Sequence, residues 1–301
     1  MRFISRSALL FILFLLLNGQ AFACLNGNIV QKLKGDFPVY MEDAASIEPG
    51  RILFSVLHYS NGVRQLKQLY AINKDPDVLS DIGLLLILER RYEKAIALYR
   101  NMEQQYPGRY ATAANMGTAF ELTGQNDSAL KWISRAVTIN PKSHDSSEWL
   151  HVNILKAKIQ GPSAINSNCL LGVDFGNDSI PEDLEFYALN KLSNAVYYQL
   201  NERMSFIKWK DPIVAQLLFD YGNIMMMNRD YSTALSLLQS AKAYGYVGPL
   251  LEMRMAYCKK GIEQKVNISL DHNISNFEIY LLSFLTGIVL IPIVLLLRMK
   301  H

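Results

Sequence analysis

The sequence predicts an all-α protein, an antiparallel helix-pair solenoid followed by one C-terminal transmembrane helix. Two observations lead to this class. Small and helix-breaking residues recur at a step of 34 residues in the middle of the chain, and an uncharged apolar run occupies residues 279–297. A fixed period of this length is typical of stacked helix–turn–helix units. The apolar run would form a helix of roughly 28 Å, close to the ~30 Å of a bilayer core.

Length, composition and net charge limit the possible folds and partners. The 301 residues are enough for one array of helical repeats. Half of them are hydrophobic and 19% are charged, with the apolar excess mainly at the two ends. The net charge is only +3, and no basic stripe with interleaved aromatic residues is present, so a nucleic-acid partner is not expected.

The first 23 residues are typical of a secretory signal peptide. Two arginines precede an uncharged apolar run at residues 8–17, and Ala21 and Ala23 form a small-residue cleavage site. A retained signal anchor is the alternative. The apolar run would make a helix of only about 15 Å, half the thickness of a bilayer core, so cleavage is favoured.

The three cysteines are Cys24, Cys169 and Cys258. Cys24 directly follows the expected cleavage site, which resembles bacterial lipoproteins, whose N-terminal cysteine is lipidated. Ala21 stands where that motif usually has leucine, so ordinary cleavage is the favoured alternative to lipidation of Cys24. A disulfide between the other two stays open, because spacing alone does not show that they meet.

The C-terminal segment is expected to be a transmembrane helix at residues 277–297, after a polar tether at 262–276. A buried core helix is the alternative. Arg298 and Lys300 follow the span, so the positive-inside rule places the tail at 298–301 in the cytoplasm. The signal peptide independently places the body outside. Together they predict a single-pass protein of the cytoplasmic (inner) membrane with a periplasmic body.

The repeat itself has a physical basis. A glycine inside a first helix costs about 1 kcal/mol of helix propensity, so it must allow a close approach of the second helix. A small residue on the second helix serves the same contact, and a proline ends that helix. These repeat-defining residues stand one period apart in two units: Gly83 and Gly117, Ala95 and Ala129, Pro107 and Pro141.

These residues resemble the tetratricopeptide repeat, with two clear units over residues 76–143. The family's large aromatic residue at the fourth position is absent from both units, where Leu79 and Ala113 stand instead. A further unit with a capping helix is expected at 211–261, where Gly222 and Ala234 repeat the spacing. The resemblance implies antiparallel helix pairs that stack into a solenoid.

The remaining segments are less regular. Residues 24–75 are expected to be a degenerate N-terminal helical unit, with helices near 51–59 and 62–73. Residues 144–210 are expected to be helical around an irregular insert at 160–181, which is rich in Gly, Asn and Ser.

No catalytic constellation stands out, and no metal site or cofactor is expected. The histidines lack metal-protease spacing and form no Cys/His cluster. The run His144-Asp145-Ser146 has the letters of a triad, but neighbours in sequence do not supply triad geometry. His151 stands where other units have glycine, and it is interpreted as a packed helix residue rather than a base.

A binding groove is the better-supported function. First helices line the concave side of such arrays. The sequence therefore predicts a non-enzymatic scaffold on the outer face of the cytoplasmic membrane that binds a protein or peptide, with no small-molecule substrate. The alternatives are an envelope-assembly or enzyme accessory factor that handles peptide or glycan, and an enzyme with its site in the 160–181 insert. By family resemblance the groove residues are Leu84, Leu88, Thr118, Glu121, Phe219, Asn223 and Met226.

Overall fold

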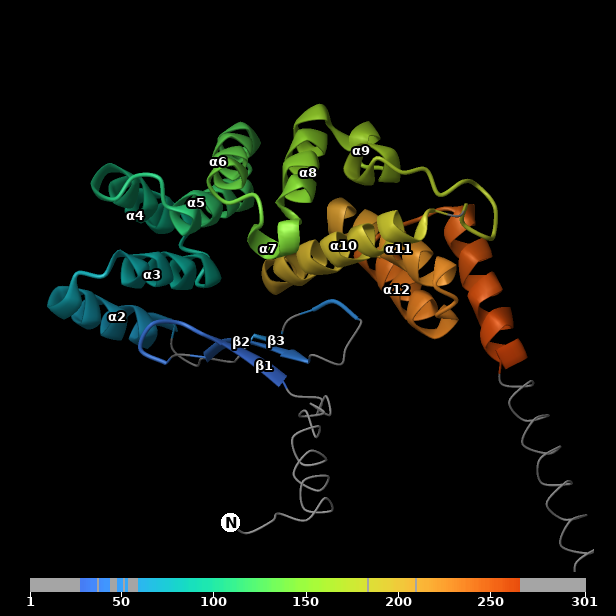
Figure 1. Ribbon diagram of the computed structural model, residues 1–301, viewed down its shortest axis with the longest axis horizontal. Helices are drawn as coiled ribbons and strands as arrows, with labels where there is room; N and C mark the ends of the chain where they lie inside the picture. Colours follow the sequence, from blue (N-terminus) through green and yellow to red (C-terminus); the bar gives the residue numbers. More distant parts are fainter. Residues whose placement is uncertain are drawn as a thin grey trace, which may run out of the picture.

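The computed structural model describes residues 28–36, 38–43, 48–50, 52–53, 59–182, 184–208 and 210–265. A small sheet precedes a long series of helices (Figure 1). The strands are β1 (Asn28–Lys32), β2 (Pro38–Asp43) and β3 (Ile52–Leu53). The helices are α2 (Tyr59–Asn73), α3 (Pro76–Leu88), α4 (Tyr92–Gln105), α5 (Tyr110–Leu122), α6 (Asn126–Ile139), α7 (Ser143–Ser146), α8 (Glu148–Gln160), the 3-10 turn η1 (Pro162–Ala164), α9 (Ser167–Leu171), α10 (Phe186–Phe206), α11 (Pro212–Met227) and α12 (Tyr231–Tyr244), and residues 249–265 are also helical.

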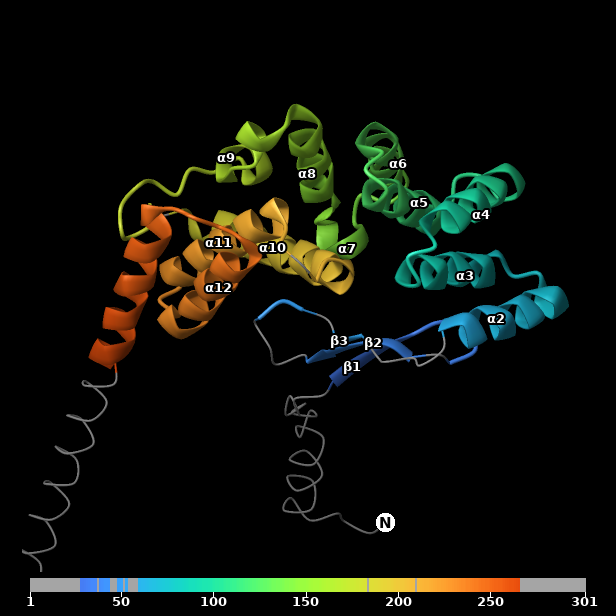
Figure 2. The same ribbon diagram turned by 180° about the vertical axis from the view of Figure 1, so that it is seen from behind.

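The helices follow one another along an arc, from α2 at one end to residues 249–265 at the other (Figures 1 and 2). Consecutive helices pack together through α2, α3, α4, α5 and α6, and again from α10 to α12. Turns of a few residues join the partners of each pair, which makes neighbours antiparallel. The expected helix-pair array is therefore confirmed, and α3 to α6 occupy residues 76–139 of the expected segment 76–143.

The repeat glycines lie at the tightest helix contacts. A Cβ on Gly117 would stand 2.6 Å from Ile133 Cδ1. The other two repeats use the same pair of positions: Gly83 faces the Tyr99 ring, and Gly222 faces Leu238. Each glycine thus leaves room for an aliphatic or aromatic side chain of the second helix, which explains why the period could be read in the sequence.

Aspartate caps followed by proline mark the N-termini of two helices. Asp75 accepts a hydrogen bond from the Asp77 backbone N–H, and Pro76 opens α3. Asp211 in the same way caps α11 through the Val214 N–H, and Pro212 follows it. An aspartate cap satisfies a backbone donor that the helix cannot, and proline lacks the N–H that would otherwise be unpaired.

The two largest hydrophobic cores of the described residues lie along the arc, and α8 contributes to both. Leu155 packs in the core of α2 to α6, whereas Leu150 and Ile154 pack in the core of α9 to α12. All three side chains are fully buried. Helix α8 is therefore the joint between the two halves of the array.

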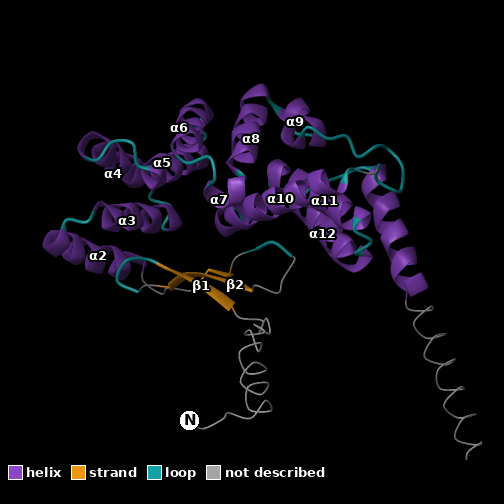
Figure 3. Ribbon diagram, viewed as in Figure 1, coloured by secondary structure: helices purple, strands orange, loops and turns teal. Residues whose placement is uncertain are grey.

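The N-terminal segment corrects the prediction of a helical unit at residues 24–75. Strands β1, β2 and β3 form an antiparallel sheet in that order, and β3 lies where a helix near 51–59 was expected (Figure 3). The physical reason is a tight turn at Gly35 and Asp36, both with positive φ, which closes a hairpin between strands that carry the β-branched residues Ile29, Val30 and Val39. Only α2 agrees with the expected helix near 62–73.

The sheet connects two distant parts of the array. The Lys34 backbone N–H donates to Asp81 Oδ2 of α3 at 2.7 Å. The Gly50 N–H donates to Asn201 Oδ1 of α10 at 2.6 Å. Figure 1 shows the sheet on the inner side of the arc, between α2 and α10.

The predicted membrane span needs correction. In the part of the chain that the structure describes, none of the helices combines the length and the apolarity needed to cross a bilayer. Helix α11 is apolar but has 16 residues, short of the roughly 20 that a span requires. The class with a C-terminal transmembrane helix and the single-pass inner-membrane location are therefore not supported. The segments concerned, 1–23, Cys24 and 277–301, lie outside the described residues, as does most of the expected tether at 262–276.

Candidate functional site

A pocket of about 90 Å³ lies between α3, α5, α8 and α10, and we call it the central pocket. It is several times larger than the space one water needs, which is about 10–15 Å³. Its apolar side includes Leu84, Ile87, Leu122, Phe206 and Ile207. Its polar side includes Asn115, Thr118, Glu121, Glu148, His151, Lys158 and Arg203.

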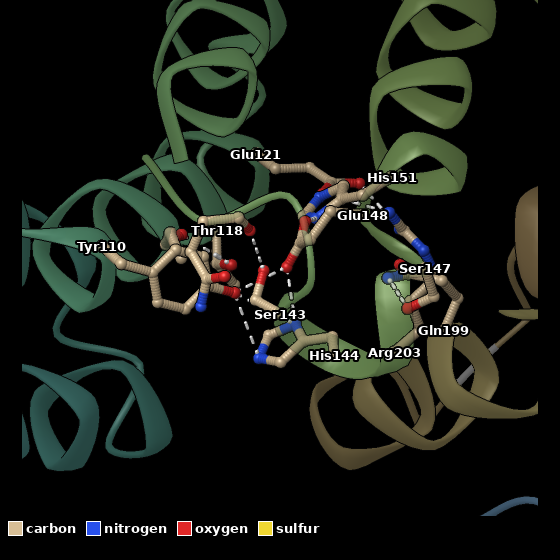
Figure 4. Close-up of polar contacts among 12 residues, drawn as sticks. Tyr110, Thr118, Glu121, Ser143, His144, Ser147, Glu148, His151, Gln199 and Arg203 are labelled. Carbon is tan, nitrogen blue, oxygen red and sulfur yellow. Dashed lines mark hydrogen bonds and ion pairs between the residues drawn. The ribbon is translucent and has the colours of Figure 1, made fainter. Parts of the chain in front are cut away.

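Glu121 of α5 is the centre of the polar side (Figure 4). Its Oε1 accepts from Arg203 Nη1 at 2.8 Å and from Lys158 Nζ at 2.7 Å. Its Oε2 lies 2.7 Å from His151 Nε2. The carboxylate is almost fully buried, and it joins α5 to both α8 and α10.

A second carboxylate, Glu148, extends the network toward α7. Its Oε1 lies 2.5 Å from His144 Nδ1 and accepts a hydrogen bond from the Tyr110 hydroxyl at 3.0 Å. The His144 ring stacks on Tyr198 of α10, with centroids 4.7 Å apart. Polar and aromatic contacts thus tie α5, α7, α8 and α10 together around the central pocket.

Both carboxylates are held ionised. Burial alone would raise the pKa of Glu121, but the charge of Arg203 and the hydrogen bond with His151 hold this pKa well below its usual value. Burial likewise opposes ionisation of Glu148, and its hydrogen bonds with His144 and His151 lower the pKa of Glu148. Opposite charges at hydrogen-bond distance outweigh desolvation at both sites.

His151 lies between these two carboxylates. Its Nε2 contacts Glu121, and its Nδ1 lies 3.6 Å from Glu148 Oε2. Burial lowers the pKa of His151, but the hydrogen bonds with Glu121 and Glu148 raise it above the usual value overall. An imidazolium donates from both nitrogens, whereas neutral imidazole donates from one. The hydrogen bond to Glu121 orients the ring, while Nδ1 lies beyond hydrogen-bond distance of Glu148.

The polar side neutralises its own charges and presents a fixed, mixed surface. Beside it lies an apolar side made by α3, α5 and α10. Such a combination suits a side chain and adjoining backbone of a bound polypeptide. Among the described residues, no group of three or more His, Cys, Asp or Glu side chains is arranged to hold a metal ion.

The structure brings some of the expected groove residues together. Leu84, Thr118 and Glu121 line the central pocket. Leu88 is half-buried against the N-terminal core instead and is not part of the lining.

The expectation for the third repeat needs correction. Phe219, Asn223 and Met226 are all less than 5% exposed, so they do not line an open groove. Phe219 stacks face to face on Tyr246, with centroids 4.2 Å apart. The reason is that the insert before α10 and the helical residues 249–265 pack over this side of α11, as described below.

Sequence reasoning missed most of the network around Glu121. Glu148 and His151 stand three residues apart on one helix, a spacing that does place side chains together. Arg203 lies 82 residues from Glu121, and no repeat position marks it. The two cysteines within the described chain, Cys169 and Cys258, are both free, so they do not form a disulfide.

Comparison with known proteins identifies the repeat. The model of the tetratricopeptide repeat family matches residues 86–157, from the end of α3 to α8. No curated protein matches the chain.

Several solved structures are similar at low sequence identity. TTC0263, a thermophilic TPR protein of Thermus thermophilus, shares 12% identity, with 68% of this chain and 92% of that chain covered and a TM-score of 0.35. A tetratricopeptide repeat protein from Parabacteroides merdae shares 10% identity, with 67% and 92% covered and a TM-score of 0.32. A double mutant of MamA shares 13% identity, with 62% and 84% covered and a TM-score of 0.34. Residues 86–157 therefore resemble the tetratricopeptide repeat by sequence as well as by their antiparallel helix pairs.

Proposed function

We propose that this protein is a non-catalytic interaction scaffold that binds a segment of a partner protein in the central pocket. The observation that carries the proposal is the position of the pocket. It lies between first helices of successive repeats, which form the ligand-facing side of such arrays. Its central carboxylate, Glu121, is already paired with Arg203, Lys158 and His151, which supports binding rather than proton transfer.

The chemistry of the pocket supports one anchoring side chain with its neighbouring backbone. Leu84 and Phe206 offer apolar contact to an aliphatic or aromatic anchor. Thr118 is half-buried, and its hydroxyl donates to the Ala114 carbonyl, which leaves its oxygen lone pairs to accept a peptide N–H. A pocket of about 90 Å³ fits such an anchor better than a folded domain.

Site-specific crosslinking tests the proposal. A photo-reactive amino acid at Thr118 should crosslink a discrete partner in cells, whereas the same group at Lys131, exposed on α6, should not. The replacement Thr118→Arg fills the pocket and should weaken binding of that purified partner by about tenfold or more, as loss of a binding hot spot does. Thr118→Ser is the matched control. Equal crosslinking at both positions, or unchanged affinity of a folded Thr118→Arg variant, would contradict the proposal.

A further inference from the structure

Residues 173–182, which we call the strap, run outside the helical array between α9 and α10. The strap leaves α9, passes beside the helical residues 249–265 and returns to the start of α10 (Figures 1 and 2). Most of its side chains are exposed or half-buried, and only Phe175 and Pro181 are buried. Few side chains of the strap therefore contribute to a hydrophobic core.

Arg254 holds the strap by its backbone. Its Nη2 donates to the Phe175 carbonyl at 2.7 Å and to the Gly176 carbonyl at 2.8 Å, and its Nε donates to the Asp178 carbonyl at 3.2 Å. Backbone carbonyls are present in every peptide, so this contact selects an extended shape rather than a particular sequence. It is the type of contact by which a protein holds a peptide ligand.

One side chain and two charges complete the contact. Phe175 is only 2% exposed and packs in the C-terminal hydrophobic core. Asp174 and Asp178 are exposed, and their charges act favourably on the Arg254 guanidinium. The occupant of this surface is thus an extended, acidic segment with a single aromatic anchor.

The surface beneath the strap belongs to the third repeat. The Arg254 guanidinium lies over the Phe219 ring, 5.4 Å from its centroid. Phe219 is on α11, the first helix of that repeat, where the family pattern places ligand-facing residues. The strap and Arg254 together cover a surface that the repeat would otherwise present to a partner.

The covered arrangement leaves polar groups without partners. Arg254 Nη1, Asp220 Oδ2 and both amide atoms of Asn223 are buried and have no hydrogen bond. Buried groups of this kind destabilise the arrangement that buries them. Gly172, with φ of 71°, ends α9 directly before the strap, in a backbone conformation that favours glycine. The unpaired Nη1 weakens the closed strap, because Arg254 is the side chain that holds the strap.

We propose that Arg254 and Phe219 form a second peptide-binding surface, which the strap occupies as an internal ligand. A partner segment of the same chemistry, extended and acidic with one phenylalanine, displaces the strap. This surface shares no residue with the lining of the central pocket, so either proposal can fail without the other.

A labelled synthetic peptide with the sequence of residues 172–182 tests the proposal on the full chain. Phe175→Ala frees the surface, so fluorescence anisotropy should show affinity about tenfold or more above wild type, because the competing closed state is lost. The double variant Phe175→Ala, Arg254→Met should lose binding, and so should a peptide with alanine in place of its phenylalanine. A folded Phe175→Ala variant that binds no better than wild type overturns the proposal.

Hydrogen exchange on the wild type gives a test without any variant. An excess of the peptide should increase amide exchange within residues 173–182 and leave residues 86–143 unchanged. Unchanged exchange in the strap at saturating peptide would overturn displacement. Concentration-dependent dimers that exchange their straps would identify a second copy of the chain as the occupant, and would equally overturn a foreign partner.

Discussion

Arg203 and Glu121 form a buried ion pair across the joint of the array, with Nη1 and Oε1 2.8 Å apart and each side chain 6% exposed. Glu121 comes from α5 in the N-terminal half, and Arg203 comes from α10 in the C-terminal half. Lys158 and His151 contact the same carboxylate from α8. Glu121 is therefore the shared partner of three cationic side chains from two helices.

These shared contacts predict that replacing Glu121 lowers the stability of the fold more than replacing Arg203. Replacing Glu121 with leucine leaves the cations of α8 and α10 facing one another, and should lower the free energy of unfolding by roughly 3–5 kcal/mol. Arg203→Met should cost less, because Lys158 and His151 still neutralise Glu121. Urea denaturation measures both. Lys242→Met is the control, since the Lys242–Glu252 pair is more than half exposed and should contribute at most about 1 kcal/mol.

His151 predicts a pH dependence of stability. Its pKa is raised in the folded state, so the stability it contributes is complete below the unfolded pKa of 6.5 and is lost as pH rises through the folded pKa. Wild type should therefore lose stability relative to His151→Gln as the buffer is taken upward from pH 6.5. Urea unfolding at a series of pH values measures the difference. A constant difference between the two proteins from about pH 6 to 9 would show that His151 does not titrate in this window.

The repeat was predictable because its signal is local and periodic. Gly117 and Ile133 lie in one helix pair, and their contact recurs at Gly83 and Gly222. A sequence shows such a pattern directly, since each position follows from the period. The groove positions Leu84 and Thr118 came from the resemblance to the tetratricopeptide repeat, and both line the central pocket.

The joint and the strap were not predictable, because their contacts have no period. Arg203 meets Glu121 across 82 residues, and Arg254 meets Phe175 across 79. Such pairs depend on the packing of segments that are distant in the sequence, which no local pattern encodes. The burial of Phe219 also results from such packing. Its repeat position alone therefore predicted an exposed groove residue, whereas the side chain is buried. The sheet was missed because its strands are short and the third has only two residues.

The close helix contact at Gly117 predicts that larger side chains at this position lower the stability of the fold. A Cβ there would meet the Ile133 side chain at 2.6 Å and the Ile133 backbone N at 3.2 Å, and backbone does not move aside easily. Gly117→Leu should lower the free energy of unfolding by about 3 kcal/mol or more, since overpacking a core typically costs 1–3 kcal/mol. Gly222→Ala should cost less than Gly117→Ala, because its nearest contacts are the flexible end of Leu238. Thermal melting checks this order, and equal melting temperatures for the two alanine variants would contradict it.

Asp220 is a buried acid whose environment opposes its charge. Its Oδ1 accepts hydrogen bonds from Ser167 Oγ at 2.6 Å and from Gln216 Nε2 at 2.9 Å, while Oδ2 has no partner. Burial raises the pKa of Asp220 to about 7, against the opposing effects of these donors and of the Arg254 charge. Desolvation therefore outweighs the hydrogen bonds and the nearby cation at this site.

The sign of the resulting pH effect follows from linkage. Because the folded pKa lies above the ordinary value of 3.8, the stability that Asp220 contributes is present below pH 3.8 and is lost as pH rises to about 7. Asp220→Asn keeps the Oδ1 acceptor and removes the charge. It should be more stable than wild type at pH 8 by on the order of a few kcal/mol, since each unit of pKa corresponds to about 1.4 kcal/mol. The gain should shrink as pH falls toward 5, and Asp127→Asn, at an exposed position of α6, should show no such trend. Urea unfolding at pH 5 and pH 8 measures this difference. A variant that is less stable than wild type at pH 8 would show that the attraction between ionised Asp220 and Arg254 outweighs desolvation.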